Sequence, residues 1–197
     1  MLSKSKARYL ISGGWVKGLQ AFSNHYSGSI TMAPGVRVGK HSVLDRYMGG
    51  SIHIGTGSLI CKNCKLVTCG GDINIGQGVQ IGDSAVITAQ GGVTIGNHVL
   101  FADNVCMIAN EHIYQDINRP IKDQGCYTKP IVIGDGSWIG INPTILQGTV
   151  IGKNCVVGAG SVVKGIFPDY SVIAGNPARV IKFYDAESGK WLKKDEN

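Results

Sequence analysis

The sequence predicts an all-β fold: a parallel β-helix, which is a solenoid shaped as a triangular prism. Isoleucine or valine recurs every six residues from Ile133 to Val163. An α-helix repeats every 3.6 residues and a half-buried strand every 2.0, so neither produces a period of six. One flat side of a parallel β-helix, built from a short strand and a turn, does repeat every six residues. We therefore expect the apolar residue of each repeat to point into the prism.

A second, longer period supports the same fold. The pairs Gly49-Gly50, Gly70-Gly71 and Gly91-Gly92 stand 21 residues apart, and each leads into a similar phrase. Three repeats of six make one triangular turn, so these turns carry two or three extra residues at one corner. The composition agrees, because the 197 residues include 29 glycines and only 16% are charged. Many tight corners, and rungs that pair backbone to backbone, suit such a composition.

Residues 1–27 differ from the rest of the chain. Their apolar residues stand at a broken helical spacing, which predicts a short N-terminal helical cap over the open end of the solenoid or against a neighbouring subunit. The alternative is a basic amphipathic anchor on an anionic membrane surface, because four lysines and arginines lie among the first 17 residues. We favour the cap over membrane contact.

The repeats occupy residues 28–182, for which we expect about seven turns stacked at the usual strand spacing. Residues 108–130 interrupt them with a polar stretch that has no period of six. A long loop in a regular solenoid is usually functional, since stacking does not require it, and we predict that this loop protrudes. We expect residues 183–197 to form a C-terminal tail that folds back over the prism.

Charge and cysteine content restrict the partners. The formal net charge is +6, but no basic run is interleaved with aromatic residues, which disfavours nucleic acid and favours an anionic small molecule. The six cysteines include one CxxC and no second such motif or histidine pair, so we expect reduced packing thiols and no metal rather than a zinc site. Neither a secretory signal nor an apolar stretch of roughly 20 residues is visible, so we expect a cytoplasmic protein.

Three motifs after the loop carry a resemblance to a known family. WIG at 138–140, GAGS at 158–161 and AGNPA at 174–178 are specific in combination, although a single IG repeat is not. With them, residues 30–182 resemble the hexapeptide-repeat acyltransferases, and most of all the branch with the galactoside, maltose and polysaccharide O-acetyltransferases. The resemblance implies a left-handed β-helix, a homotrimer, and an active site in the cleft between two prisms that takes acetyl-CoA as donor.

The resemblance implies that His112 is the catalytic base, because this residue stands at the mouth of the loop, where the family places its histidine. A sugar hydroxyl is too weak an acid to attack a thioester unaided, and a neutral imidazole that takes its proton typically contributes about 10²–10⁴ in rate. We expect direct attack without an acyl-enzyme, because no Ser or Cys is placed beside a second base. The alternatives are a surface histidine without a role and a γ-class carbonic anhydrase, which needs three histidine ligands where this loop has one.

For coenzyme A, the resemblance implies backbone contacts along the coil that follows Trp138. Gly140 or Ile141 would lie near the thioester, and the N–H of either could stabilise the oxyanion. Ala159 would lie along the pantetheine arm, and Trp138 would either wall the acceptor pocket or pack at a corner. Basic residues at the end of the coil would meet the nucleotide phosphates, although the first comes one position earlier than in many members: Lys164, Arg179 and Lys182.

The sequence therefore predicts an acetyl-CoA-dependent O-acetyltransferase that acts on a sugar of a cell-surface polysaccharide or its precursor. The Asn and Asp that hold the sugar in the galactoside and maltose enzymes have no counterpart in register here, so we expect a different acceptor. Candidate acceptor-binding residues lie in the loop: Asn110, Glu111, Asn118 and Arg119. The alternatives are an antibiotic hydroxyl or an amino sugar as acceptor, or a β-helix assembly module without catalysis.

Overall fold

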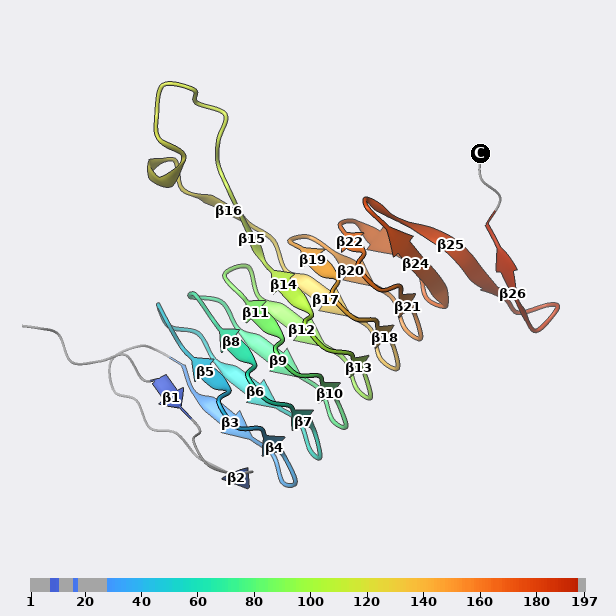
Figure 1. The fold of residues 1–197 in the computed structure, drawn as a ribbon, viewed down its shortest axis with the longest axis horizontal. Helices are drawn as coiled ribbons and strands as arrows, with labels where there is room; N and C mark the ends of the chain where they lie inside the picture. The colour runs from blue at the N-terminus through green and yellow to red at the C-terminus, as the bar shows by residue number, and fades with distance from the viewer. Residues whose placement is uncertain (1–7, 11–15, 18–27, 195–197) are drawn as a thin grey trace, which may run out of the picture.

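The computed structural model describes residues 8–10, 16–17 and 28–194. Residues 30–175 form a left-handed parallel β-helix with six complete turns and a partial seventh (Figure 1). Each complete turn contributes one short strand to each of three sheets, first to sheet C, then to sheet B, then to sheet A. The predicted all-β prism is confirmed.

The three sheets run along the length of the prism. Sheet A contains, in order, β1 (Arg8–Leu10), β5 (Val43–Asp45), β8 (Lys65–Val67), β11 (Val86–Thr88), β14 (Cys106–Ile108), β19 (Thr144–Leu146) and β22 (Val162–Val163). Sheet B contains β2 (Val16–Lys17), β4 (Arg37–Val38), β7 (Leu59–Ile60), β10 (Gln80–Ile81), β13 (Leu100–Phe101), β18 (Trp138–Ile139), β21 (Val156–Val157), β24 (Ser171–Gly175), β25 (Ala178–Asp185) and β26 (Lys190–Lys193). Sheet C contains β3 (Ile30–Met32), β6 (Ile52–Ile54), β9 (Ile73–Ile75), β12 (Val93–Ile95), β17 (Ile131–Ile133), β20 (Val150–Ile151) and β23 (Ile166–Phe167).

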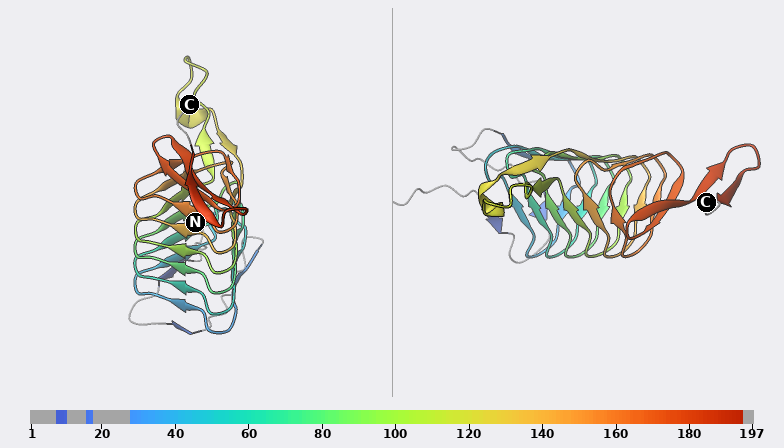
Figure 2. Two further views of the ribbon diagram at one scale, coloured as in Figure 1. Left: turned by 90° about the vertical axis from the view of Figure 1, so that its right-hand side faces the viewer. Right: turned by 90° about the horizontal axis from the view of Figure 1, so that it is seen from above.

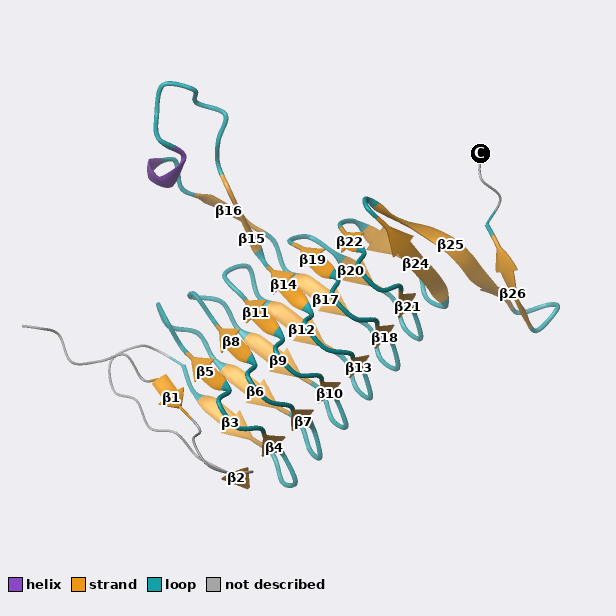
Figure 3. Cartoon of the chain, viewed as in Figure 1, coloured by secondary structure: helices purple, strands orange, loops and turns teal. Residues whose placement is uncertain are grey.

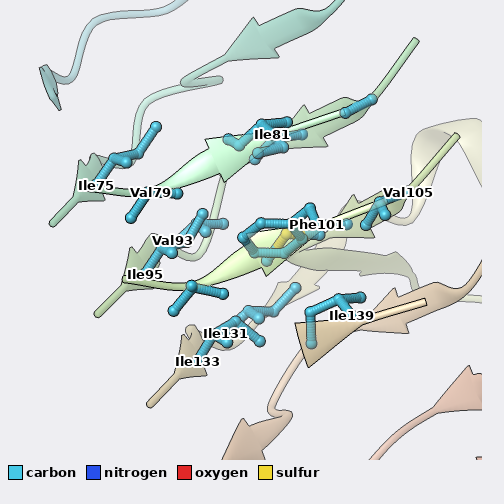
Figure 4. Packing of buried hydrophobic residues seen from close by; sticks show 14 of the residues in the cluster. Ile75, Val79, Ile81, Val93, Ile95, Phe101, Val105, Ile131, Ile133 and Ile139 are labelled. Atoms are coloured by element: carbon cyan, nitrogen blue, oxygen red, sulfur yellow. The ribbon is translucent and has the colours of Figure 1, made fainter. Parts of the chain in front are cut away.

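The core is a set of apolar columns inside the prism. Strands of successive turns pair in register, so Ile81 stacks on Phe101 and Phe101 on Ile139 (Figure 4). All three side chains are fully buried. Burying a side chain of this size contributes roughly 1.5–3 kcal/mol, so the columns stabilise the solenoid. The expectation that the repeated apolar residue points inward is confirmed.

The repeated glycine is required because successive turns approach closely. A Cβ on Gly134 would lie 2.5 Å from the carbonyl carbon of Gly152 in the next turn, and one on Gly140 would lie 2.8 Å from the carbonyl oxygen of Val157. Real Cβ atoms essentially never come that near to backbone. The glycine therefore permits the close approach that strand pairing between the turns requires.

The prediction of an N-terminal helical cap is wrong for the residues described there. β1 pairs antiparallel with β5, and β2 pairs antiparallel with β4, so both segments extend sheets of the first turn. Open strand edges at the end of a solenoid accept such pairing, which overrides the weak helical spacing. The other residues of the segment 1–27 lie outside the described residues. No helix in the described ranges is long and apolar enough to cross a membrane.

The loop and the tail both leave the prism. Residues 110–128 form an antiparallel hairpin of β15 (Asn110–His112) and β16 (Cys126–Thr128), with a 3₁₀ helix η1 (Ile121–Asp123) between them (Figure 3). The predicted protrusion is confirmed. The tail does not fold back over the prism as expected: β25 and β26 extend sheet B beyond the last turn (Figure 2). The free edge of β24 supplies the hydrogen bonds for this extension, and Tyr184 packs between Tyr170 and Trp191.

Candidate active site

Two corners of the prism carry the candidate functional residues. We call the segment between a sheet B strand and the next sheet A strand the B–A corner, and the segment between a sheet A strand and the next sheet C strand the A–C corner. The hairpin (residues 110–128) emerges from the A–C corner of the fourth turn. The WIG and GAGS motifs end at the B–A corners of the fifth and sixth turns. The two corners lie at opposite ends of the sheet A strands.

His112 lies at the end of β15, exposed to solvent. Its ladder partner is Cys126 on β16, and the Cys126 sulfur lies 3.4 Å from His112 Nδ1. The Asn110 amide nitrogen reaches the same sulfur at 4.0 Å. The hairpin therefore brings a cysteine beside the predicted base itself, a pairing that sequence reasoning missed. Fourteen residues separate the pair, and the register of the hairpin brings them together.

Glu111 points to the other face of the hairpin, toward the prism. Its Oε2 accepts a hydrogen bond from Lys164 Nζ at 2.9 Å and another from Gln147 Nε2 at 3.1 Å. These bonds to Lys164 and then Gln147 lower the pKa of Glu111 from its ordinary value. Glu111 therefore anchors the hairpin to the fifth and sixth turns, instead of lying free for an acceptor as expected.

Lys164, which was expected at the nucleotide phosphates, lies beside the hairpin of its own chain. The lysine follows β22 at an A–C corner, away from the GAGS corner, and it is paired with Glu111.

Sequence reasoning missed Gln147. It is buried, and its Oε1 atom has no hydrogen-bond partner among the described residues. The same corner position holds Thr68, Ala89 and Ala109 in the three preceding turns, all fully buried. The sequence signal that could have identified Gln147 was a long amide side chain at a position where the preceding turns have small residues.

The tip of the hairpin is organised by Gln124. Its Nε2 donates to the backbone oxygens of Asp116 and Arg119, each at 2.8 Å. The Arg119 guanidinium donates to the Asp123 carbonyl, and the Asn118 backbone N–H donates to an Asp116 carboxylate oxygen. The side chains of Asn118 and Arg119 are exposed on this tip, and no described contact joins them to His112.

The B–A corner contains a ladder of backbone amides and side-chain acceptors. The Lys62 N–H donates to Asp83 Oδ1 in the next turn at 2.8 Å, and the Asp83 N–H donates to Asp103 Oδ1 at 2.8 Å. The next two turns place Ile141 and Ala159 at this position, and neither side chain can accept a hydrogen bond. The ladder therefore stops where the WIG motif begins.

The end of the ladder leaves a row of amides without acceptors. Within the described residues, the N–H groups of Asp103, Ile141 and Ala159 make no hydrogen bond. The Gly140 N–H donates to the Val157 oxygen at 2.8 Å, so the oxyanion role considered for Gly140 is wrong and Ile141 is the remaining candidate. Unpaired amides on an exposed corner are ready to bind a ligand that carries acceptors.

Arg179 lies beyond this row, and Lys182 lies to its side. Arg179 pairs with Ala174, and Ala174 stacks on Gly158: a Cβ added to Gly158 would lie 3.0 Å from the Ala174 methyl group. Arg179 therefore continues the B–A corner beyond the GAGS motif. Lys182 pairs with Val172 on the outer side of sheet B. Both basic side chains are exposed.

Trp138 occupies the outer surface of sheet B, within β18, and its side chain is exposed. The alternative in which it packs at a corner is therefore wrong. In the described ranges there is no group of three or more metal-ligating side chains. The fold of one chain brings His112 next to Cys126 but does not bring it to the amide row of Ile141 and Ala159.

Known proteins share this sequence pattern and this fold. The family description "Bacterial transferase hexapeptide (six repeats)" matches residues 130–165. The probable acetyltransferase Rv3034c of Mycobacterium tuberculosis is 36% identical over 79% of this chain, and the chain spans about half (50%) of that relative's length. WbbJ of Escherichia coli strain K12, whose proposed role is O-acetyl transfer in lipopolysaccharide biosynthesis, is 36% identical over 73% of this chain and 78% of its own length. A crystal structure of a mutant of AntD, an N-acyltransferase from Bacillus cereus in complex with dTDP and coenzyme A, shares the fold with a TM-score of 0.62, at 20% identity, over 83% of this chain and 85% of that chain.

Proposed function

This chain belongs to the bacterial hexapeptide-repeat transferases, and from that membership we propose that it transfers an acetyl group from acetyl-CoA to a sugar hydroxyl. The observation that carries the proposal is the row of unpaired amides at Ile141 and Ala159. Pantetheine is a chain with two amide groups, so its carbonyl oxygens can accept the hydrogen bonds that the corner leaves unmade. In this proposal Arg179, farther along the same corner, binds the phosphates of the nucleotide end.

His112 is the general base in this proposal. Its Nε2 takes the proton of the acceptor hydroxyl as the oxygen attacks the acetyl carbon, and the proton then passes to the sulfur of the departing coenzyme A. The Ile141 N–H stabilises the negative charge on the acetyl oxygen. These two groups supply the proton transfer and the oxyanion contact that acyl transfer from a thioester requires.

His112 and Ile141 lie at opposite ends of the sheet A strands, too far apart to act on one substrate within a single chain. A second copy of the chain therefore completes the site. The outer row of sheet A in turns three to five has no charged side chain; it contains Val86, Thr88, Cys106, Ile108, Thr144 and Leu146. The outer row of sheet C is polar through four turns; it contains Thr31, His53, Asn74 and Thr94. A homotrimer with sheet A facing the three-fold axis would place the amide row of one copy beside the hairpin of the next.

The acceptor in this proposal is a sugar of a cell-surface polysaccharide or its precursor, and the compartment is the cytoplasm. WbbJ supports this class, because its proposed role lies in lipopolysaccharide biosynthesis and the chain aligns with most of its length. The exposed hairpin tip, with Asn118 and Arg119, offers polar groups that could hydrogen-bond a sugar beside His112 of the same hairpin. A growing saccharide is long enough to need such an open approach.

Calorimetric titration with acetyl-CoA tests the donor half of the proposal. Wild type and His112→Ala are both expected to bind about one acetyl-CoA per chain, because His112 lies outside the amide row. Only the wild type is expected to release the coenzyme A thiol when sugar acceptors are added. Absence of binding by both proteins would overturn the acetyltransferase proposal and favour an assembly module.

Complementation tests the shared site. At an acetyl-CoA concentration near the wild-type Kd, His112→Ala and a variant blocked at the amide row, Ala159→Asp, are each expected to have little activity. Mixed trimers of the two would contain sites with both intact halves, about a quarter of the total under random mixing of a cyclic oligomer. Recovery of activity supports a site built from two copies, and no recovery in mixed trimers that form would contradict it.

A further inference from the structure

We propose that Cys126 is a positioning residue for His112: its sulfur accepts a hydrogen bond from Nδ1–H and so holds the imidazole in the tautomer whose Nε2 can take a proton. The inference rests on the role of His112 as base in the proposed function. It assigns a role to Cys126, which neither the repeat pattern nor the similarity to known proteins does.

The geometry of the hairpin places the two side chains on one face. The Ile113 N–H donates to the Gly125 oxygen at 3.0 Å, so by the alternation of an antiparallel ladder the next pair, His112 and Cys126, is the narrow pair without backbone hydrogen bonds. Side chains are closest in such pairs, and the sulfur indeed lies 3.4 Å from Nδ1. A sulfur is a weak acceptor, and this separation suits it.

The neighbours of the pair leave the sulfur as the group that faces the ring. Glu111, the adjacent carboxylate, points to the opposite face of the hairpin, where it binds Lys164 and Gln147. Asn110 directs its amide nitrogen at Cys126 from the same face, at 4.0 Å, and so supports the sulfur. Among the described residues, Cys126 is the side chain in hydrogen-bond contact with the His112 ring.

The chemistry explains why a sulfur at Nδ1 matters. A neutral imidazole carries its proton on one nitrogen, and the partner of that nitrogen selects the tautomer. A proton held on Nδ1 leaves the Nε2 lone pair free for the acceptor hydroxyl. When Nε2 takes the acceptor proton, the ring becomes an imidazolium and its Nδ1–H bond to sulfur strengthens. Cys126 thus orients the base before the reaction and stabilises it during proton transfer.

A cysteine beside a histidine could instead act as a nucleophile. In that case the thiolate would attack acetyl-CoA, the carbon–sulfur bond to coenzyme A would break, and the acetyl group would remain on Cys126. An acetyl group on the sulfur would end its contact with Nδ1 and leave His112 unoriented for the second transfer. The geometry therefore favours the positioning role, and the two roles make different predictions.

The tautomer of His112 is the direct test. Protein with ¹⁵N-labelled histidine is examined by two-bond ¹H–¹⁵N correlation at a pH where the ring is neutral, with the His112 signals assigned from their loss in His112→Gln. Wild type and Cys126→Ser are expected to show the proton on Nδ1, since a hydroxyl oxygen also accepts. Cys126→Ala is expected to show a mixture of tautomers. Cys61→Ser, which removes a half-buried thiol from the B–A corner of the second turn, is the matched control and is expected to leave the spectrum unchanged.

Kinetic and mass measurements complete the test. With acetyl-CoA and water as acceptor, Cys126→Ala is expected to release thiol about 10-fold to 100-fold more slowly than wild type, because it loses part of the contribution of the base. Its affinity for acetyl-CoA is expected to be unchanged. An unchanged tautomer in Cys126→Ala would overturn the inference, and so would a stable acetyl group on Cys126 detected by mass spectrometry. Because the tautomer is measured without substrate, failure of the inference is distinct from failure of acetyl-CoA binding, which would refute the proposed function.

Discussion

A side-chain acceptor restored at the B–A corner of the sixth turn should block the binding of acetyl-CoA. Ala159→Asp would place a carboxylate where the two preceding ladder residues, Asp83 and Asp103, accept an N–H at 2.8 Å. By the same geometry the new Oδ1 would accept from the Ile141 N–H, which has no partner among the described residues. The substitution therefore occupies the amide that we assign to the donor.

The magnitude follows from the hydrogen bond that the donor would lose. A hydrogen bond to a charged acceptor contributes about 1.5–3 kcal/mol net, so a ligand that must displace it should bind roughly 10-fold to 100-fold more weakly. Repulsion between the carboxylate and the phosphates of coenzyme A adds to this loss. The new hydrogen bond should preserve or raise the melting temperature, so weak binding would not reflect unfolding.

Lys153→Asn is the matched control. Lys153 lies in the same turn as Ala159, at the corner between sheets C and B. A similar ladder runs along that corner: the Gln77 N–H donates to Asn97 Oδ1, and the Asn97 N–H donates to Asp135 Oδ1. The new asparagine would offer an acceptor to the Asp135 N–H, and both substitutions lower the net charge by one. Calorimetry with acetyl-CoA is expected to show weak binding for Ala159→Asp and wild-type binding for Lys153→Asn. Equal, undiminished affinity in a folded Ala159→Asp would refute the assignment of the donor to this corner.

Four further predictions follow from the anchor, the thiols and the core. Lys164→Met should detach the hairpin and speed its amide hydrogen exchange several-fold, with unchanged affinity for acetyl-CoA; unchanged exchange would contradict the anchor. The hydrogen bonds from Lys164 and Gln147 lower the pKa of Glu111, so its contribution to stability is present above its unfolded pKa and is lost as the pH falls through the folded value. The side-chain amide signals of Gln147 should therefore titrate below the ordinary glutamate pKa in wild type and not in Glu111→Gln; the same titration in both proteins would contradict the contact. Burial raises the pKa of Cys64 to about 11, so iodoacetamide at pH 8 should modify Cys126 before Cys64, as peptide mass mapping would detect; the reverse order would be inconsistent with the burial. Phe101→Ala should lower the free energy of unfolding by about 3–5 kcal/mol in a denaturant titration, and a loss below 1 kcal/mol would contradict the packed column.

The solenoid could be predicted from the sequence because its physics is local and repeated. Each apolar residue of the six-residue period meets the equivalent residue of the next turn, so one pattern fixes both the strand and its partner. The glycine at Gly134 recurs for the same reason, since every turn approaches the next at the same distance. Prediction was wrong at the ends of the chain, where β1 and β25 pair with open edges that no periodicity specifies.

The candidate site was only partly predictable. His112 could be selected from its place at the start of the loop, but the pairing with Cys126 depends on a hairpin register that the polar loop sequence does not encode. Lys164 was expected at the phosphates, and in its own chain its side chain pairs with Glu111. Ile141 and Ala159 were expected from the resemblance, and the interrupted acceptor ladder gives a physical reason for the role that we propose for them.

The most direct test of the donor site is a titration of ¹⁵N-labelled protein with acetyl-CoA, followed through the amide signals of Ile141 and Ala159. Hydrogen bonds from these amides to pantetheine should move both proton resonances downfield together, at the concentration where calorimetry detects binding. The Gly140 amide, already bonded to Val157, should move little. Saturable binding that leaves Ile141 and Ala159 unshifted would contradict a donor site at this corner.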